Sequence, residues 1–188
     1  MAMPPDLQDA MQREIAAADE FSFDFKAFEE AMKGADMLSM IIRGHLYLEH
    51  ALIQMLVEAM SLPNVSLVRR MNFPMKLDMC IALGLLGEEW KAPVNKVNEM
   101  RNKVAHRLNF EFSQNEKDEL FALFPPLVQQ MTLDEVGAKD KSHLAWGNIL
   151  RVLPIAMDIY RQQRMIGRVR EKYSAEYLRR TLAKSKRA

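Results

Sequence analysis

The sequence has few cysteine and glycine residues, the types that form disulfides and make the backbone flexible. Its single cysteine, Cys80, excludes a disulfide within the chain and lies in an apolar run as a small core residue. Glycine is also scarce, with seven residues against fifteen methionines. Because methionine is a good helix former with an adaptable side chain, this composition favours a helical protein. The lone cysteine predicts a cytoplasmic one.

Long hydrophobic runs and leader-like segments are also missing. The most apolar stretch, residues 37–60, is too polar for a bilayer, because it contains Arg43, His45, Glu49, His50 and Glu58. The first 25 residues hold six acidic side chains and no basic segment followed by an apolar one. Neither a signal peptide nor membrane association is therefore expected.

The sequence gives no support for cofactor chemistry. Its four histidines are scattered, and no third ligand accompanies His45 and Glu49 at a metal-binding spacing. It contains no glycine-rich phosphate loop and no nucleophile elbow. We therefore expect no metal and no cofactor, and an enzyme of this sequence would need a reaction that uses few residues.

Helical pattern extends over most of the chain. The 188 residues, 49% apolar and 27% charged, suffice for one domain with a full hydrophobic core. No stretch alternates apolar and polar residues long enough to predict a strand. We therefore expect an all-α, single-domain helical bundle, with helices at about 6–18, 24–34, 36–61, 74–86, 93–108, 114–124, 140–166 and 169–185. Turns are expected at 65–71 and 126–139, Gly87 should close the helix that Pro74 opens, and Pro154 should kink or break its helix.

Charge is distributed unevenly along the chain. Residues 161–188 hold ten Lys or Arg against two acids, whereas the remainder holds 16 against 23. A basic end on an acidic body could contact phosphate or an acidic partner. The alternative is a solvated terminal helix with no ligand.

The helix expected at 93–108 has a polar stripe. At 100° per residue, one face carries Asn95, Asn98, Asn102 and His106, and the opposite face carries Val97, Met100, Val104 and Leu108. Arg101 falls on the boundary, where its stem can pack on apolar neighbours while its guanidinium reaches the stripe. Because asparagine is unfavourable inside a helix, the stripe indicates either a functional site or a solvated polar face.

In the helix expected at 36–61, Glu49 lies on an apolar face. One stripe of this helix carries Arg43, Tyr47, His50, Gln54 and Glu58. His45 and Glu49 project elsewhere, among leucine and isoleucine side chains. A carboxylate on an apolar face needs a partner, so we expect Glu49 to pair with Arg101 or His106, or alternatively with His45 one turn earlier.

The segment Arg101-Asn102-Lys103-Val104-Ala105-His106 resembles the Arg-x4–6-His signature of the HEPN superfamily (higher eukaryotes and prokaryotes nucleotide-binding domains), in which a polar residue commonly follows the arginine. The preceding context is similar, with a long helix containing Glu49 and an apolar helix ending in Leu83-Gly84-Leu85-Leu86-Gly87. The resemblance covers about residues 36–110. It implies a HEPN-type core at about 36–125 with added terminal helices, the last one basic at about 167–188. The mannitol-operon-repressor-like proteins are similar in the same arrangement.

The resemblance also implies a function. HEPN proteins are typically metal-independent endoribonucleases or RNA-binding proteins, so the expected ligand is single-stranded RNA and the expected role is that of a toxin in a toxin–antitoxin or defence system. His106 would be the general acid or base, Arg101 would bind the scissile phosphate, and Asn102 would orient the imidazole or donate to phosphate. The supporting residues would be Glu49, Asn98, Asn95, His50 and Arg43.

Two kinds of partner follow from the same resemblance. A homodimer is implied, because HEPN ribonucleases usually bring two motifs to a shared cleft. An antitoxin or a regulatory protein is the other expected partner. The alternative function is a non-catalytic regulatory or protein-interaction module of the same fold, in which Arg101 and His106 brace Glu49.

Overall fold

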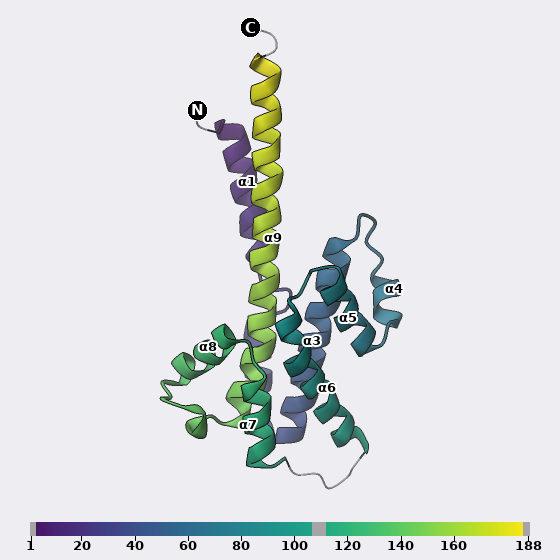
Figure 1. The fold of residues 1–188 in the computed structure, drawn as a ribbon, viewed down its shortest axis with the longest axis vertical. Coiled ribbons are helices and arrows are strands. Elements are labelled where there is room, and N and C mark those ends of the chain that lie inside the picture. Colours follow the sequence, from purple (N-terminus) through teal and green to yellow (C-terminus); the bar gives the residue numbers. More distant parts are fainter. Residues whose placement is uncertain (1–2, 107–111, 186–188) are drawn as a thin grey trace. The chain divides into compact units, whose positions relative to one another are not determined.

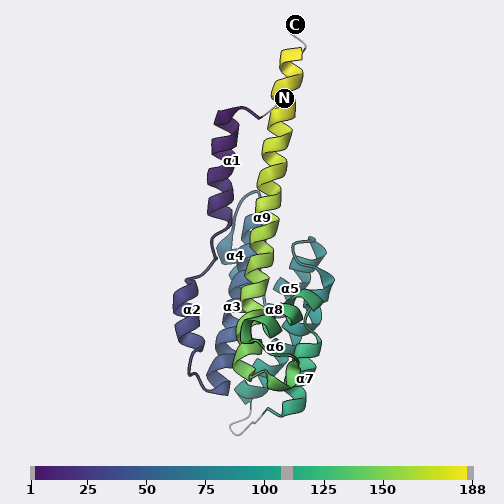
Figure 2. The ribbon, with the colours of Figure 1, turned by 90° about the vertical axis from the view of Figure 1, so that its left-hand side faces the viewer.

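The computed structural model describes residues 3–106 and 112–185, and in this part of the chain it contains helices and turns but no strand. The all-α prediction is therefore confirmed. Figures 1 and 2 together show the helices, which are α1 (Pro5–Ala18), α2 (Phe25–Met32), α3 (Met37–Ala59), α4 (Val65–Arg70), α5 (Phe73–Ala82), α6 (Lys91–His106), α7 (Gln114–Ala122), α8 (Pro126–Val136) and α9 (Trp146–Ser185). Two 3₁₀ turns, η1 (Glu88–Trp90) and η2 (Lys141–His143), precede α6 and α9.

The chain divides into two compact units. The larger unit is Ser22–Asp158, and the smaller unit combines Met1–Phe21 with Ile159–Ala188. Helix α9 contributes its first part to the larger unit and its second part to the smaller one. No helix among the described residues has both the length and the apolar character needed to cross a bilayer.

Helix α3 is the centre of the larger unit. It packs against α5 and α6, and also contacts α2 and α4. Contacts along α3 fix the direction of α5: Phe73 stacks on His45, and Cys80 Sγ lies 3.6 Å from the carbonyl oxygen of Leu52. The two helices therefore run in the same direction, and α6 returns along them in the opposite direction (Figure 1).

Two segments expected as turns are helices. Residues 65–70 form α4, because the Asn64 side chain accepts from the amide of Leu67 and the fully buried Val68 anchors the helix. Residues 126–136 form α8, which opens on a proline and ends at Gly137 in the left-handed conformation, φ 62°. The turn residues at both places are thus caps of short helices.

Two helix ends also differ from the prediction. Helix α5 ends at Ala82, and Gly84, with φ 62°, takes the terminating position expected for Gly87. Helix α9 runs unbroken to Ser185, so the two helices expected at 140–166 and 169–185 are one. By contrast, α7 begins as the pattern Ser113-Gln114-Asn115-Glu116 predicts, with a capping box between Ser113 and Glu116.

Pro154 does not break α9, and its surroundings show how it is accommodated. A proline cannot donate to the carbonyl four residues earlier, which here belongs to Leu150. A β-carbon at Gly44 of α3 would lie 3.4 Å from that same carbonyl oxygen. Gly44 of α3 therefore faces α9 at the turn that lacks its helical hydrogen bond, at a separation where a β-carbon would make ordinary contact.

In the smaller unit, acids on α1 pair with bases on α9. The two helices pack through a core of Leu7, Val169 and Tyr173. Lys172 Nζ lies 2.7 Å from Glu14 Oε1, and Arg180 lies 2.8 Å from Asp6 Oδ2. Both figures show α1 alongside the second part of α9 (Figures 1 and 2). Part of the basic charge predicted for a terminal ligand site is therefore neutralised within the unit.

Candidate functional site

The predicted motif lies in the last turns of α6. Arg101 and Asn102 are both exposed, and the Arg101 guanidinium donates to Asn102 Oδ1 at 3.2 Å. Within the described part of the chain, Arg101 has no carboxylate partner. His106 is the last residue of α6, and its side chain lies outside the described residues, as does Leu108.

The asparagine side chains on the polar stripe of α6 differ in burial. Asn98 is half-buried, and its Oδ1 accepts from His45 Nε2 of α3 at 3.0 Å. Asn95 is half-buried as well, whereas Asn102 is exposed. The opposite face follows the prediction at Val97 and Met100, which are buried. Asn98 therefore joins α6 to α3, while Asn102 stays available beside Arg101.

The described ion pair of Glu49 is with Lys76, a residue that was not among the expected partners. Lys76 Nζ of α5 lies 2.5 Å from Glu49 Oε1, and only 2% of the Lys76 side chain is exposed, against 27% for Glu49. Arg101, His106 and His45 were the expected partners. A signal for Lys76 was present in the sequence, because this lysine stands between Met75 and Leu77 in an apolar helix, where its ammonium group needs a counter-charge.

His45 is a site residue that the sequence reasoning did not select. Its ring stacks on Phe73 with centroids 4.3 Å apart, and only 6% of the residue is exposed. Burial is the main influence on its pKa and lowers it below the ordinary histidine value. The hydrogen bond to Asn98 and the charge of Glu49 act in the opposite direction, while Arg101 and Lys76 add to the lowering. The available signal was the same as for Glu49, a polar residue among leucines.

His45, Glu49, Lys76 and Asn98 form what we call the polar cluster. Each pair in it connects two helices: Glu49 with Lys76 joins α3 to α5, and His45 with Asn98 joins α3 to α6. No buried side-chain nitrogen or oxygen among the described residues is left without a hydrogen-bond partner. The polar cluster thus fixes the side of α6 that faces the core, and Arg101 lies one turn beyond Asn98.

Two predicted supporting residues belong to a different face of α3. Arg43 donates to the carbonyl oxygen of Ala31, and His50 Nε2 donates to that of Ser22 at 2.8 Å. Tyr47 lies between them and packs edge-on against Phe23 and Phe28. Arg43 and His50 therefore hold residues 22–32 against α3. The structure does not bring them together with Arg101.

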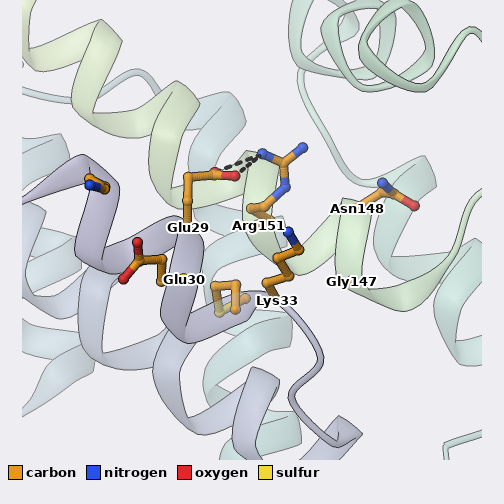
Figure 3. Close-up of a pocket in the computed structure, with 8 residues that line it drawn as sticks. Glu29, Glu30, Lys33, Gly147, Asn148 and Arg151 are labelled. Carbon is orange, nitrogen blue, oxygen red and sulfur yellow. Dashed lines mark hydrogen bonds and ion pairs between the residues drawn. The ribbon is translucent and has the colours of Figure 1, made fainter.

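The larger unit also has an open pocket that includes none of the predicted residues. It has a volume of about 400 Å³ and is lined by Lys26, Glu29, Glu30, Met32, Lys33, Gly147, Asn148 and Arg151. Figure 3 shows the Arg151 guanidinium directed at Glu29, whose two oxygens lie 2.7 and 2.8 Å from Nη1. Arg151 also pairs with Glu135. Two carboxylates therefore hold the only arginine among the residues that line the pocket.

No constellation of metal ligands occurs in the described residues. Nowhere in this part of the chain do three His, Cys, Asp or Glu side chains come together as a metal ion would require. What the described side chains offer chemically is an exposed guanidinium and an amide at the end of α6, above the buried polar cluster.

The fold and the site define an all-helical protein that presents an exposed arginine from a helix anchored by buried polar pairs. Comparisons with known proteins do not narrow this class, since no family model, curated protein or solved structure matches the chain. The HEPN resemblance therefore rests on the motif of α6 and on the order of the helices around it.

The Glu49–Lys76 pair should contribute strongly to stability. Glu49→Leu leaves the Lys76 ammonium buried without its counter-charge, and we expect a loss of about 3 kcal/mol in the free energy of unfolding, measured by urea denaturation. Adding Lys76→Met should recover most of the loss, because an apolar pair of similar volume replaces both charges. Lys91→Met, which breaks an exposed pair with Asp78, should change little. A double variant as unstable as Glu49→Leu would contradict this account.

The lowered pKa of His45 predicts that acid destabilises the protein. Below about pH 6.5 the unfolded chain takes up a proton that the buried imidazole resists, so the free energy of unfolding should fall as the pH decreases from there. His45→Gln should flatten this part of the pH profile in urea denaturation. His143→Gln, which changes an exposed histidine, is the control and should keep the wild-type slope. An unchanged slope in His45→Gln would refute the assignment.

Proposed function

We propose that this chain is a metal-independent endoribonuclease of the HEPN type that acts on single-stranded RNA. The observation that carries the proposal is the state of Arg101, which is exposed and has no carboxylate partner in the described part of the chain. A guanidinium in this state can donate two parallel hydrogen bonds to a phosphate. The adjacent Asn102 supplies a further amide for the same anion or for the imidazole of His106.

The proposed chemistry divides the work between two side chains. Arg101 stabilises the charge that develops on the scissile phosphate. His106 takes the proton of the ribose 2′-hydroxyl or supplies one to the leaving 5′-oxygen, and its near-neutral intrinsic pKa suits both roles. Glu49 and Asn98 act indirectly, because they belong to the polar cluster that holds α6 in place. A role as toxin in a toxin–antitoxin or defence pair accords with such an activity.

The described contacts do not favour the alternative function, a non-catalytic interaction module. In that interpretation Arg101 and His106 brace Glu49. The described ion pair of Glu49 instead goes to Lys76, and Arg101 is exposed. Arg101 therefore does not serve as the counter-charge of Glu49, and a ligand-binding role accounts for it better.

Cleavage of single-stranded RNA in the presence of EDTA is the direct test. We expect His106→Ala and Arg101→Ala each to reduce the cleavage rate by at least roughly 100-fold. Arg101→Ala should change the free energy of unfolding by no more than about 0.5 kcal/mol, because the side chain is exposed. His143→Ala, purified in the same way, should cleave like the wild type and thereby exclude a contaminating nuclease.

Either of two results would refute the catalytic proposal. One is undiminished cleavage by His106→Ala. The other is a marked loss of thermal stability in Arg101→Ala, which would favour the bracing role of the alternative module.

We further propose that the active form is a homodimer that buries an apolar stripe on α3. Leu38, Ile42 and Leu46 recur at one-turn spacing and are 49, 39 and 54% exposed. Helix α5 begins at Phe73, which stacks on His45, so it does not extend along the preceding turns of α3. Because α6 runs in the opposite direction to α3, its motif end lies beside these turns (Figure 1). A dimer formed here would bring two motifs close together.

The dimer is tested by Leu46→Glu. A buried glutamate at the interface should convert the dimer to monomers in analytical ultracentrifugation and lower the rate of RNA cleavage accordingly. Leu127→Glu on α8 is the matched control, since that leucine is also exposed, at 73%, and lies far from α3 in sequence. If the Leu46→Glu protein remains dimeric, the α3 stripe is not the dimer interface.

A further inference from the structure

The corner between α4 and α5 has positive charge without matching negative charge. Residues 59–77 contain Arg69, Arg70 and Lys76 and no Asp or Glu. Lys76 is buried and held by Glu49. Arg69 and Arg70 are exposed, and neither has a carboxylate partner within the described part of the chain. We call these two arginines and the adjoining first turn of α5 the basic corner.

The basic corner has a defined local structure. Val68 is fully buried, so α4 is anchored directly before the two arginines, and the amide of Met71 donates to the carbonyl oxygen of Val68 at 3.1 Å. Asn72 then caps α5 by accepting from the amide of Met75 at 2.9 Å. The amides at the start of α5 add partial positive charge to that of the guanidinium groups.

A chain of contacts relates the basic corner to the end of α6. Arg70 stands three residues before Phe73, so their Cα atoms are at most about 11 Å apart. Phe73 stacks on His45, and His45 bonds to Asn98, one helical turn before Arg101. Phe73, His45 and Asn98 thus form a continuous series of contacts from the segment that follows Arg70 to the turn of α6 that precedes Arg101.

We propose that the basic corner is a second phosphate-binding site for the RNA strand that Arg101 engages. This inference rests on the proposed function and adds the path of the substrate, from the end of α6 towards Arg69 and Arg70. Single-stranded RNA fits because its phosphates are regularly spaced, and because paired donors on arginine match each phosphate. Such contacts position a strand and confer no base specificity.

Binding of fluorescein-labelled oligouridine tests the proposal, with His106→Ala as the parent protein so that the RNA is not cleaved. Adding Arg69→Gln and Arg70→Gln should weaken binding roughly tenfold at low salt. The slope of log K against log salt concentration should become shallower by about 1.4, because two phosphate contacts are lost. Lys139→Gln with Lys141→Gln is the matched control, since both lysines are exposed in the same unit and the charge change is equal.

The outcomes separate this inference from the proposed function. If the two arginine substitutions do not weaken RNA binding, or if the two lysine substitutions weaken it equally, the basic corner is overturned and the proposed function is not. A parent that binds no oligouridine overturns RNA as the ligand and the basic corner with it. If polyglutamate displaces the RNA at the same concentration of charge, the ligand is an acidic protein, and RNA as the ligand is overturned. Circular dichroism of both double variants should match the parent, because all four side chains are exposed.

Discussion

The ion pair between Glu49 and Lys76 is the constraint on which the arrangement of helices around the candidate site depends. A lysine with almost no exposed surface forces a carboxylate to a fixed position on α3, and that fixes the register of α5 against α3. Phe73 then stacks on His45, and His45 in turn takes Asn98 as its partner. The placement of α6 thus follows from a series of polar requirements that begins with one buried charge.

This order of constraints explains why α6 can present polar groups at its end. Its core side is fixed by Val97, Met100 and the bond from Asn98, so the residues one turn later need not contribute to packing. Arg101 and Asn102 are consequently exposed, and their side chains hydrogen-bond each other rather than the core. A site on a rigid helix keeps its geometry better than one on a loop.

The sequence predicted the helical class, the long helix at 36–61 and the capped start of α7, because each depends on local periodicity or caps. It failed where tertiary contacts decide the outcome. Nothing local indicates that the buried Val68 stabilises α4, or that α9 continues past Pro154. The candidate site followed the same division: helical spacing identified the stripe of α6, but the partner of Glu49 lies 27 residues away in α5, beyond the reach of any single-helix wheel.

Pro154 and Gly44 are each unfavourable inside a helix, yet they meet at one point, the carbonyl oxygen of Leu150. Replacing the proline would allow a backbone hydrogen bond to that carbonyl, and a β-carbon at Gly44 would stand at ordinary contact distance from the same oxygen. Substitutions at these two positions should therefore change stability separately, although both lie against one carbonyl group.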